Sequence, residues 1–306
     1  PMLQTVAITV QTAGNPDTNA NGKGIQARDY GSNPVYQGGM VIDAIIASGT
    51  PDADSGRDFD ADGTTDTYRE VVQDMADMYA YGQNDAASGG AAGGWRYGWN
   101  YGSSDNSISQ WAAIGLMPAQ EAPWSCAVPS WVKTLNNGTW LNYSHYIWSS
   151  GGVEYGGFGY TNPSPIWGWD AVTPSGMIQL SFSGSTTADA RWVRCERWLA
   201  DTWNTWLAQN NVYAYYALAK AMRLARPTPV STFASNNFDW YRGSGTTLGL
   251  AEKVANQLIN YSYWDYYGPN LGTAWSVIIL RPVLFAEAPI ACFDADPNPS
   301  YPDLSI

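Results

Sequence analysis

Apolar side chains recur at helical spacing along most of this 306-residue chain. Between residues 68 and 83 they occupy positions i, i+3, i+4, i+7 and i+11, as Tyr68, Val71, Val72, Met75 and Tyr79. This spacing puts them on one face of a helix and leaves charged residues on the opposite face. The segment is therefore predicted to be an amphipathic helix that packs one side on a core.

Two kinds of helical segment alternate along the chain. Segments that are apolar on most of their sides span residues 36–48, 106–121, 173–182, 211–225 and 271–285. Segments with a distinct polar face span residues 68–83, 128–143, 188–209 and 248–264. A helical hairpin of this composition cannot bury its apolar face alone, so several hairpins have to stack. We expect an all-α fold, an α/α-toroid in which an apolar inner ring of helices is wrapped by an amphipathic outer ring.

The toroid domain is expected at residues 36–288. Residues 1–35 begin with a strand-like run and continue as a polar loop rich in Gly and Asn, which predicts an extended N-terminal segment. Residues 289–306 are rich in Pro and lack periodicity, which indicates a linker or the start of a following module.

Helix starts and stops carry their own residue preferences. Asp105 or Asn106 is a suitable N-cap for the second apolar helix. Thr173 is expected to cap the third, with Pro174 in its first turn, where proline is best tolerated. Pro282 is expected to kink or end the last helix.

The charge balance excludes several classes of partner. With 27 acidic and 15 basic residues the formal net charge is -12, so nucleic acid and anionic lipid headgroups are repelled and cations are attracted. One histidine, His145, and three cysteines are too few for the usual soft-metal and haem ligand sets. No apolar run is long enough to span a membrane. We therefore expect no nucleic-acid partner and no membrane span.

Three cysteines permit at most one internal disulfide. Cys126 and Cys195 are the first pair to consider, because both lie near the ends of predicted outer helices. Three buried free thiols, Cys292 included, are an equally good interpretation.

Two segments rich in Gly and aromatic residues precede inner helices. Residues 93–121 read GGWRYGWNYGSSDNSISQWAAIGLMPAQE, and residues 156–180 read GGFGYTNPSPIWGWDAVTPSGMIQL. They resemble the Gly-Gly-aromatic loops and following inner helices of prenyltransferase and squalene-oxidase repeats, which build the α/α-toroids of terpenoid cyclases and protein prenyltransferases. More narrowly, the first segment resembles a group of secreted bacterial proteins with such repeats. The likeness extends over residues 36–285.

The end of the chain carries a second, shorter resemblance. Residues 292–303, CFDADPNPSYPD, resemble the entry into an immunoglobulin-like PKD module. This resemblance implies a modular extracellular or cell-surface protein, in which the chain belongs to a larger assembly or forms a homo-oligomer.

The catalytic residues of the resembled family are matched poorly. Its squalene and hopene cyclases protonate an alkene with an acid of a DxDD-type cluster, where burial and neighbouring carboxylates keep a proton available. Here the corresponding regions offer Asp105 and Asp170, each alone and each at a helix start, where an aspartate commonly caps the helix. The zinc set of the prenyltransferases is not matched, because no motif brings His145 near a Cys and an Asp. Glu154 joins Asp105 and Asp170 as a candidate acid for carbohydrate chemistry.

The strongest chemical motif is the acidic loop DFDADGTTD, Asp58 to Asp66. Alternating carboxylates can surround one hard cation while Gly63 permits the sharp turn, as in the calcium loops of dockerin, thrombospondin-type and EF-hand-like repeats. An EF-hand helix pair is not expected, because Arg69 stands where the twelfth-position Glu would be. The candidate ligands are the carboxylates of Asp58, Asp60, Asp62 and Asp66 and the backbone carbonyl of Thr64.

The alternative interpretation of this loop is a solvated acidic turn without an ion. A weaker version of the calcium motif, DTNANGKG at residues 17–24, offers Asp17, Asn19 and Asn21 with less charge.

Four large rings, Trp95, Tyr97, Trp99 and Tyr101, fill the first Gly/aromatic loop. Such rings either pack a wall, the preferred interpretation, or present a platform to a glycan or hydrophobic ligand. The sequence as a whole predicts a secreted calcium-binding structural or binding module of an extracellular or cell-surface assembly. The alternative is a terpenoid-cyclase-like or carbohydrate-active enzyme that uses the toroid cavity.

Overall fold

The computed structural model describes residues 3–27, 33–165, 168–261 and 269–280. Within these ranges the fold is mostly helical, as the sequence predicts, with three short two-stranded antiparallel sheets. None of the described helices is both long and apolar enough to cross a lipid bilayer.

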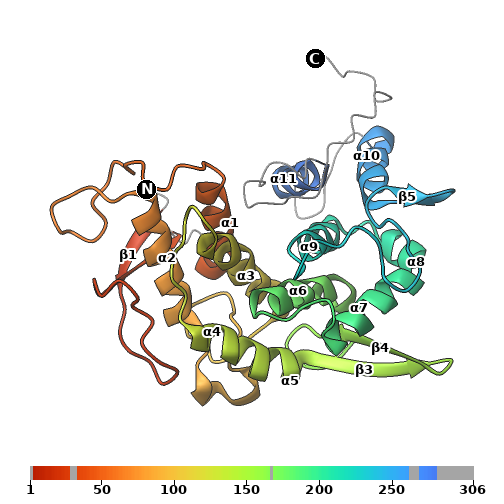
Figure 1. Ribbon diagram of the computed structural model, residues 1–306, viewed down its shortest axis with the longest axis horizontal. Helices are drawn as coiled ribbons and strands as arrows, with labels where there is room; N and C mark the ends of the chain where they lie inside the picture. The colour runs from red at the N-terminus through yellow and green to blue at the C-terminus, as the bar shows by residue number, and fades with distance from the viewer. Residues whose placement is uncertain (1–2, 28–32, 166–167, 262–268, 281–306) are drawn as a thin grey trace.

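The helices fall into a central and a peripheral group (Figure 1). The central helices are α1 (Pro34–Ile46), α3 (Asn106–Gln120), α6 (Trp169–Phe182), α9 (Val212–Arg223) and α11 (Pro269–Leu280). The peripheral helices are α2 (Tyr68–Gly82), α4 (Ser130–Leu135), α5 (Asn142–Ser144), α7 (Ala190–Asp201), α8 (Trp203–Leu207) and α10 (Leu250–Tyr261). Each central helix packs against the next in the order α1, α3, α6, α9, α11, and in Figure 1 they form an arc around a common centre.

Glycines let α1 and α3 approach closely. A Cβ on Gly39 of α1 would collide with the backbone carbonyl of Trp111 in α3, and a Cβ on Gly115 of α3 would lie 3.2 Å from the side chain of Ile42 in α1. Close backbone approach of this kind requires a residue without a side chain. The two glycines thus set the spacing of the first two central helices.

Aromatic rings fill the space between the central helices. The indole of Trp111 stacks on Tyr216 of α9 and Trp275 of α11, with centroid distances of 5.5 and 6.3 Å, and it contacts Tyr36 of α1 at 4.7 Å. Offset stacking at these distances adds to the gain from burying the rings. Side chains from three other helices therefore meet around the indole of Trp111 in α3.

The three small sheets lie outside this arc. Strand β1 (Leu3–Ala7) pairs with β2 (Lys23–Ala27), β3 (His145–Ser150) with β4 (Val153–Phe158), and β5 (Gly243–Ser244) with β6 (Thr247–Leu248). The β3–β4 hairpin packs against α7. Trp148 stands opposite Tyr155 in that hairpin, and their rings stack at 5.8 Å.

Helix α6 begins earlier than the sequence predicts. It starts at Trp169, so Thr173 and Pro174 lie inside the helix and not at its cap. The missing N–H of Pro174 would have bonded the carbonyl of Asp170, four residues earlier. That carbonyl instead accepts the indole N–H of Trp206 at 2.9 Å, which explains how the helix continues through the proline.

Two predicted outer helices are interrupted. The helix expected at residues 128–143 is divided into α4, a π-helical turn at Asn136–Leu141, and α5. The helix expected at residues 188–209 is divided into α7 and α8 at Thr202. By contrast Asp105, one of the two caps predicted for α3, is its N-cap.

The disulfide considered between Cys126 and Cys195 is not formed, since both residues are buried free thiols. Burial raises the pKa of the Cys126 thiol to about 11 and that of Cys195 further still. The third cysteine, the predicted kink at Pro282 and the predicted linker at residues 289–306 lie outside the described residues.

Candidate functional site

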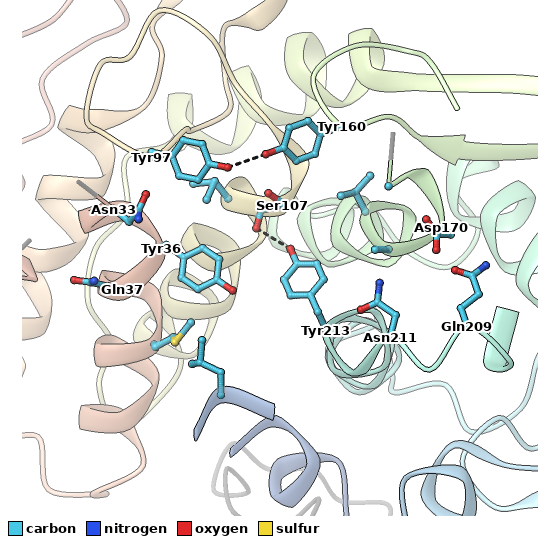
Figure 2. Close-up of a pocket in the computed structure, with 16 residues that line it drawn as sticks. Asn33, Tyr36, Gln37, Tyr97, Ser107, Tyr160, Asp170, Gln209, Asn211 and Tyr213 are labelled. Atoms are coloured by element: carbon cyan, nitrogen blue, oxygen red, sulfur yellow. Dashed lines mark hydrogen bonds between the residues drawn. The ribbon is translucent and has the colours of Figure 1, made fainter. Parts of the chain in front are cut away.

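A cavity of about 910 Å³ opens where the N-terminal ends of all five central helices meet (Figure 2). The start of α1 contributes Asn33, Tyr36, Gln37 and Met40, and the start of α6 contributes Gly168, Asp170, Ala171 and Val172. Helix α3 contributes Ser107 and Ile108, and helix α11 contributes Leu271. The remaining lining residues are Tyr97, Tyr160, Gln209, Asn211 and Tyr213. Four tyrosines and four side-chain amides supply most of its polar groups. Cavities of this size are typical of sites for small molecules.

Tyrosine hydroxyls form one side of the cavity. The hydroxyls of Tyr97 and Tyr160 lie 2.9 Å apart and share a hydrogen bond, drawn in Figure 2. The hydroxyl of Tyr213 donates to the backbone carbonyl of Ser107 at 3.0 Å and accepts from the side-chain amide of Gln110. Burial raises the pKa of Tyr160 well above its ordinary value. The Tyr160 hydroxyl is thus protonated, and hydrogen bonds hold the three hydroxyls in fixed positions.

Asp105 lies behind this side and not on its surface. One carboxylate oxygen caps α3 by accepting from the Ile108 N–H at 2.8 Å and from the Ser107 hydroxyl at 2.7 Å. Among the described residues the other oxygen has no hydrogen-bond partner, and it lies 3.8 Å from Nε of Arg96. Burial raises the pKa of Asp105 to about 6, although the cap hydrogen bonds and Arg96 oppose the rise.

The other two candidate acids lie in different parts of the molecule. Asp170 lines the cavity from the first turn of α6, beside Gln209 and Asn211 (Figure 2). Glu154 lies in the β3–β4 hairpin, where it forms an ion pair of 2.5 Å with Arg194 of α7 and does not line the cavity. The structure therefore brings one of the three candidate acids to the cavity surface and places a second directly behind it.

The four rings of the first Gly/aromatic loop have separate environments. Trp95 is completely buried, and its indole N–H donates to the carbonyl of Tyr79, so no ligand can reach it. Trp99 packs edge-on against Tyr79 and donates to the side chain of Gln26. Tyr101 is exposed beneath the guanidinium of Arg96, which also lies over Tyr97. Only Tyr97 lines the cavity, so the four rings do not form a continuous platform.

The acidic loop gathers three of its predicted carboxylates. One oxygen each from Asp58, Asp60 and Asp66 lies within 4.8 Å of the others. Asp66 is buried and precedes Thr67, the N-cap of α2. Burial and the nearby carboxylates, Asp60 first among them, raise the pKa of Asp66, while the N–H of Phe59 opposes the rise.

Asp62 and Thr64 are turned toward each other within this loop. The carboxylate of Asp62 accepts from the backbone N–H and hydroxyl of Thr64 at 2.8 and 2.6 Å, and Asp62 is not part of the three-carboxylate group. The predicted five-ligand set is therefore divided into a cluster of three and a hydrogen-bonded pair.

The weaker motif folds onto helix α2. The side-chain amides of Asn19 and Asn21 both donate to the carboxylate of Asp74, and Thr18 donates to Asp77. The carboxylate of Asp17 accepts from the N–H of Gly22 and does not approach closely enough to form a three-acid group. Two of the three predicted ligands, Asn19 and Asn21, thus attach the loop to the buried acid Asp74, and the neighbouring Thr18 attaches it to Asp77.

Asp74 and Asp77 were not singled out from the sequence, although they lie on the polar face of the 68–83 helix. Both are buried, and burial is the main cause that raises their pKa values, to about 7 for Asp74 and about 6 for Asp77. Tyr36, Tyr160 and Tyr213 were missed as cavity residues because they come from three distant segments. An aromatic residue near the start of an apolar helix is the signal that could have indicated Tyr36 and Tyr213, and a place in the second Gly/aromatic loop could have indicated Tyr160.

His145 belongs to no group of potential metal ligands in the described part of the chain. Its ring packs on Phe158 at 5.2 Å, and burial lowers its pKa to about 4, so it is neutral near pH 7. It opens strand β3 and does not line the cavity.

Comparisons with protein-family models, with curated proteins and with solved structures find no match for this chain.

Proposed function

We propose that this chain is a binding module of an extracellular or cell-surface assembly, and that its cavity holds a glycan segment. The observation that carries the proposal is the cavity of about 910 Å³ that is lined by tyrosines and side-chain amides at the meeting point of five helix ends. Binding sites of this kind combine aromatic surface with a few fixed polar groups.

The lining suits a ligand with rings and many hydroxyl groups. Tyrosine rings can lie against the C–H face of a sugar ring, while their hydroxyls bond to its polar edge. The Tyr97–Tyr160 pair can both donate and accept at one point, and the amides of Gln37, Gln209 and Asn211 offer further donors and acceptors. A purely hydrophobic ligand would leave these polar groups without partners.

The α/α-toroid is part of this proposal. Sequential packing of the five central helices supports it, as do their N-terminal ends at one cavity and the peripheral helices around them. In such an arrangement the ligand site lies at one end of the inner ring, where the Gly/aromatic loops enter the inner helices. This accounts for the presence of both Gly/aromatic loops near the cavity.

Calcium is proposed as a structural ion at Asp58, Asp60 and Asp66. The three oxygens are close enough to share one hard cation. The cation would neutralise the neighbouring carboxylates, whose charges add to burial in raising the pKa of Asp66. Phe59 within the loop accepts from the hydroxyl of Thr5 in β1, and Asp66 directly precedes α2. The ion would therefore order a loop that is hydrogen-bonded to strand β1 and leads into helix α2. Millimolar extracellular calcium is sufficient for a weak site of this type.

The alternative is a carbohydrate-active or terpenoid-cyclase-like enzyme. It is favoured by the buried carboxyl of Asp105, whose pKa is raised to about 6 and which bonds the Ser107 hydroxyl at the cavity. Most glycoside hydrolysis uses two carboxylates that flank the scissile bond. Asp170 is the one carboxylate among the described lining residues, which favours binding over this chemistry.

The test is a titration of the purified chain with glycan oligomers, followed by analysis of the oligomers after long incubation. Binding with unchanged oligomers is expected, and Tyr97 and Tyr160 should report it through fluorescence or chemical shift. Turnover of a glycan or polyprenyl substrate that is lost in Asp105→Asn would overturn the binding role in favour of the enzyme. Failure to bind any glycan oligomer would contradict both the proposed glycan ligand and the proposed role as a binding module.

A further inference from the structure

Among the described residues, the charge on the cavity surface is of one sign. Of the 16 described residues that line the cavity, Asp170 is the single charged residue, and none is Lys, Arg or His. The guanidinium of Arg96 lies over the rings of Tyr97 and Tyr101 and donates to the Ser103 hydroxyl, and Arg96 is not a lining residue. An anionic ligand would therefore meet no cationic side chain among the described lining residues of this cavity.

Asp170 is held in place through its backbone while its carboxylate is left available. Its carbonyl accepts the indole N–H of Trp206 at 2.9 Å, and it stands in the first turn of α6. Within the described residues its carboxylate makes no hydrogen bond and no ion pair. Figure 2 shows it beside Gln209 and Asn211, on the side of the cavity formed by α6 and α9.

A carboxylate in a partly enclosed site is best compensated by a cation that also donates hydrogen bonds. Charge-assisted hydrogen bonds are shorter than neutral ones and about twice as strong. Tyrosine faces also attract cations, and Tyr36 and Tyr213 line the same cavity. Both features favour a ligand that carries an ammonium group.

The N-terminal ends of the helices favour a ligand of the opposite charge. Each of the five N-termini contributes a partial positive charge at the cavity, which favours anions. Two of these ends are already satisfied by side chains, since Asp105 accepts from Ile108 in α3 and Asn211 accepts from Ala214 in α9. At the start of α6, Asp170 is itself the acidic residue of the first turn, so its charge opposes the partial positive charge of that helix end. A full negative charge on one side chain dominates the short-range contacts of a ligand group that reaches it.

We infer that the cavity selects an amino glycan, with a free ammonium group of the sugar placed on the Asp170 carboxylate and the sugar ring beside the cavity tyrosines. This inference rests on the proposed glycan-binding function and adds its charge specificity. Gln209 and Asn211 are positioned to bond the hydroxyls next to the amino group.

The experiment compares two ligands that differ in one group. Oligomers of β-1,4-linked glucosamine and of β-1,4-linked N-acetylglucosamine, equal in length, are titrated calorimetrically at mildly acidic pH and physiological ionic strength. The glucosamine oligomer is expected to bind about tenfold more tightly, the size expected for one hydrogen bond to a charged group. Its affinity should fall as rising pH removes the proton from the amine.

Variants separate the Asp170 contact from general attraction to an acidic protein. Asp170→Asn should remove the preference for the amino oligomer, and Asp170→Ser should give the same loss. Glu252→Gln is the matched control, because Glu252 is an exposed acid in the first turn of α10. This control should keep the preference.

The outcomes distinguish the two proposals. Equal or tighter binding of the acetylated oligomer overturns the amino-glycan inference and leaves glycan binding intact. A preference that survives in Asp170→Asn also overturns the inference, since the attraction would then come from the net charge of -12. Binding of neither oligomer overturns both.

Discussion

The hydroxyl of Tyr97 lies 2.9 Å from the hydroxyl of Tyr160, although the two residues are 63 positions apart. Tyr97 belongs to the first Gly/aromatic loop and Tyr160 to the second. The backbone supports the same contact, because the N–H of Asn106 donates to the carbonyl of Tyr160 at 2.9 Å. The two similar segments of the sequence therefore meet at one point, at the edge of the cavity.

Removing either hydroxyl should weaken binding without unfolding the protein. Tyr97→Phe and Tyr160→Phe each delete one partner of the shared hydrogen bond and one contact to a ligand, so affinity for glucosamine oligomers should fall about fivefold. Calorimetric titration measures the change. Tyr101→Phe is the control, because Tyr101 is exposed and does not line the cavity. Unchanged affinity in both cavity variants would contradict the assignment of this side of the site.

Calcium should raise the melting temperature of the wild-type chain. A ligand at about 100 times its dissociation constant stabilises the folded state by about 2.7 kcal/mol. Asp60→Asn should remove most of this gain, because Asp60 belongs to the three-carboxylate group and its one backbone hydrogen bond, from the N–H of Asp62, can be kept by an amide oxygen. Differential scanning fluorimetry with and without calcium is the measurement.

The neighbouring acid provides the comparison for this site. Asp62→Asn should retain more of the calcium effect than Asp60→Asn, since the Asp62 carboxylate is turned to Thr64. A wild-type melting temperature that calcium does not change would show that the loop is a solvated acidic turn. An equal loss in the two variants would mean that Asp62 turns toward the ion.

Asp74 should make the calcium-free protein less stable as the pH rises. Its pKa is raised from 3.8 to about 7 in the folded state, mainly by burial, with the charges of Asp77 and Asp66 as smaller contributions. Between these values the folded state keeps a proton that the unfolded state loses, so the free energy of unfolding falls by up to about 1.4 kcal/mol for each pH unit. Below the lower value both states are protonated and the effect vanishes.

The variant Asp74→Asn isolates this contribution. Its stability relative to wild type should increase as the pH is raised from about 4 to about 7, as measured by urea unfolding at several pH values. Asp52→Asn is the control, because the side chain of Asp52 is 79% exposed. A difference between Asp74→Asn and wild type that does not vary with pH would contradict the prediction.

Helical periodicity predicted the peripheral helix α2 and the central helix α3 well, because the pattern of buried positions in each is local in sequence. The amphipathic face of residues 68–83 and the apolar run of residues 106–121 both correspond to single helices, α2 and α3. Residues 142–158 were harder, because α5 passes directly into the β3–β4 hairpin. The hairpin is stabilised by contacts with α7, among them the pair of Glu154 and Arg194, about 40 positions later. A contact of that range leaves no local pattern.

The two candidate sites also differ in how local their residues are in the sequence. The acidic loop is contiguous, so the alternation of Asp residues was sufficient to indicate it. The cavity is assembled from five helix starts, and neither Tyr36 nor Tyr213 stands in a recognisable motif. The start of α6 was also obscured, because Pro174 suggests a helix beginning there and only the distant indole of Trp206 explains its tolerance. Long-range partners of this kind can be found only once the fold is known.

Removing one partner of the buried ion pair between Asp43 of α1 and Lys220 of α9 should strongly destabilise the packing of the central helices. The Nζ of Lys220 lies 2.8 Å from the Asp43 carboxylate, and both side chains are less than a tenth exposed. Lys220→Met would leave the carboxylate buried without its cation, which typically costs about 3–5 kcal/mol of unfolding free energy. Urea unfolding should show this loss, with the double variant Asp43→Leu and Lys220→Met recovering most of it.

Glu121→Gln provides the contrast, because the pair of Glu121 and Arg226 is 43% exposed on each side and should contribute less than about 1 kcal/mol. If Lys220→Met and Glu121→Gln cost the same, the buried pair does not hold α1 to α9.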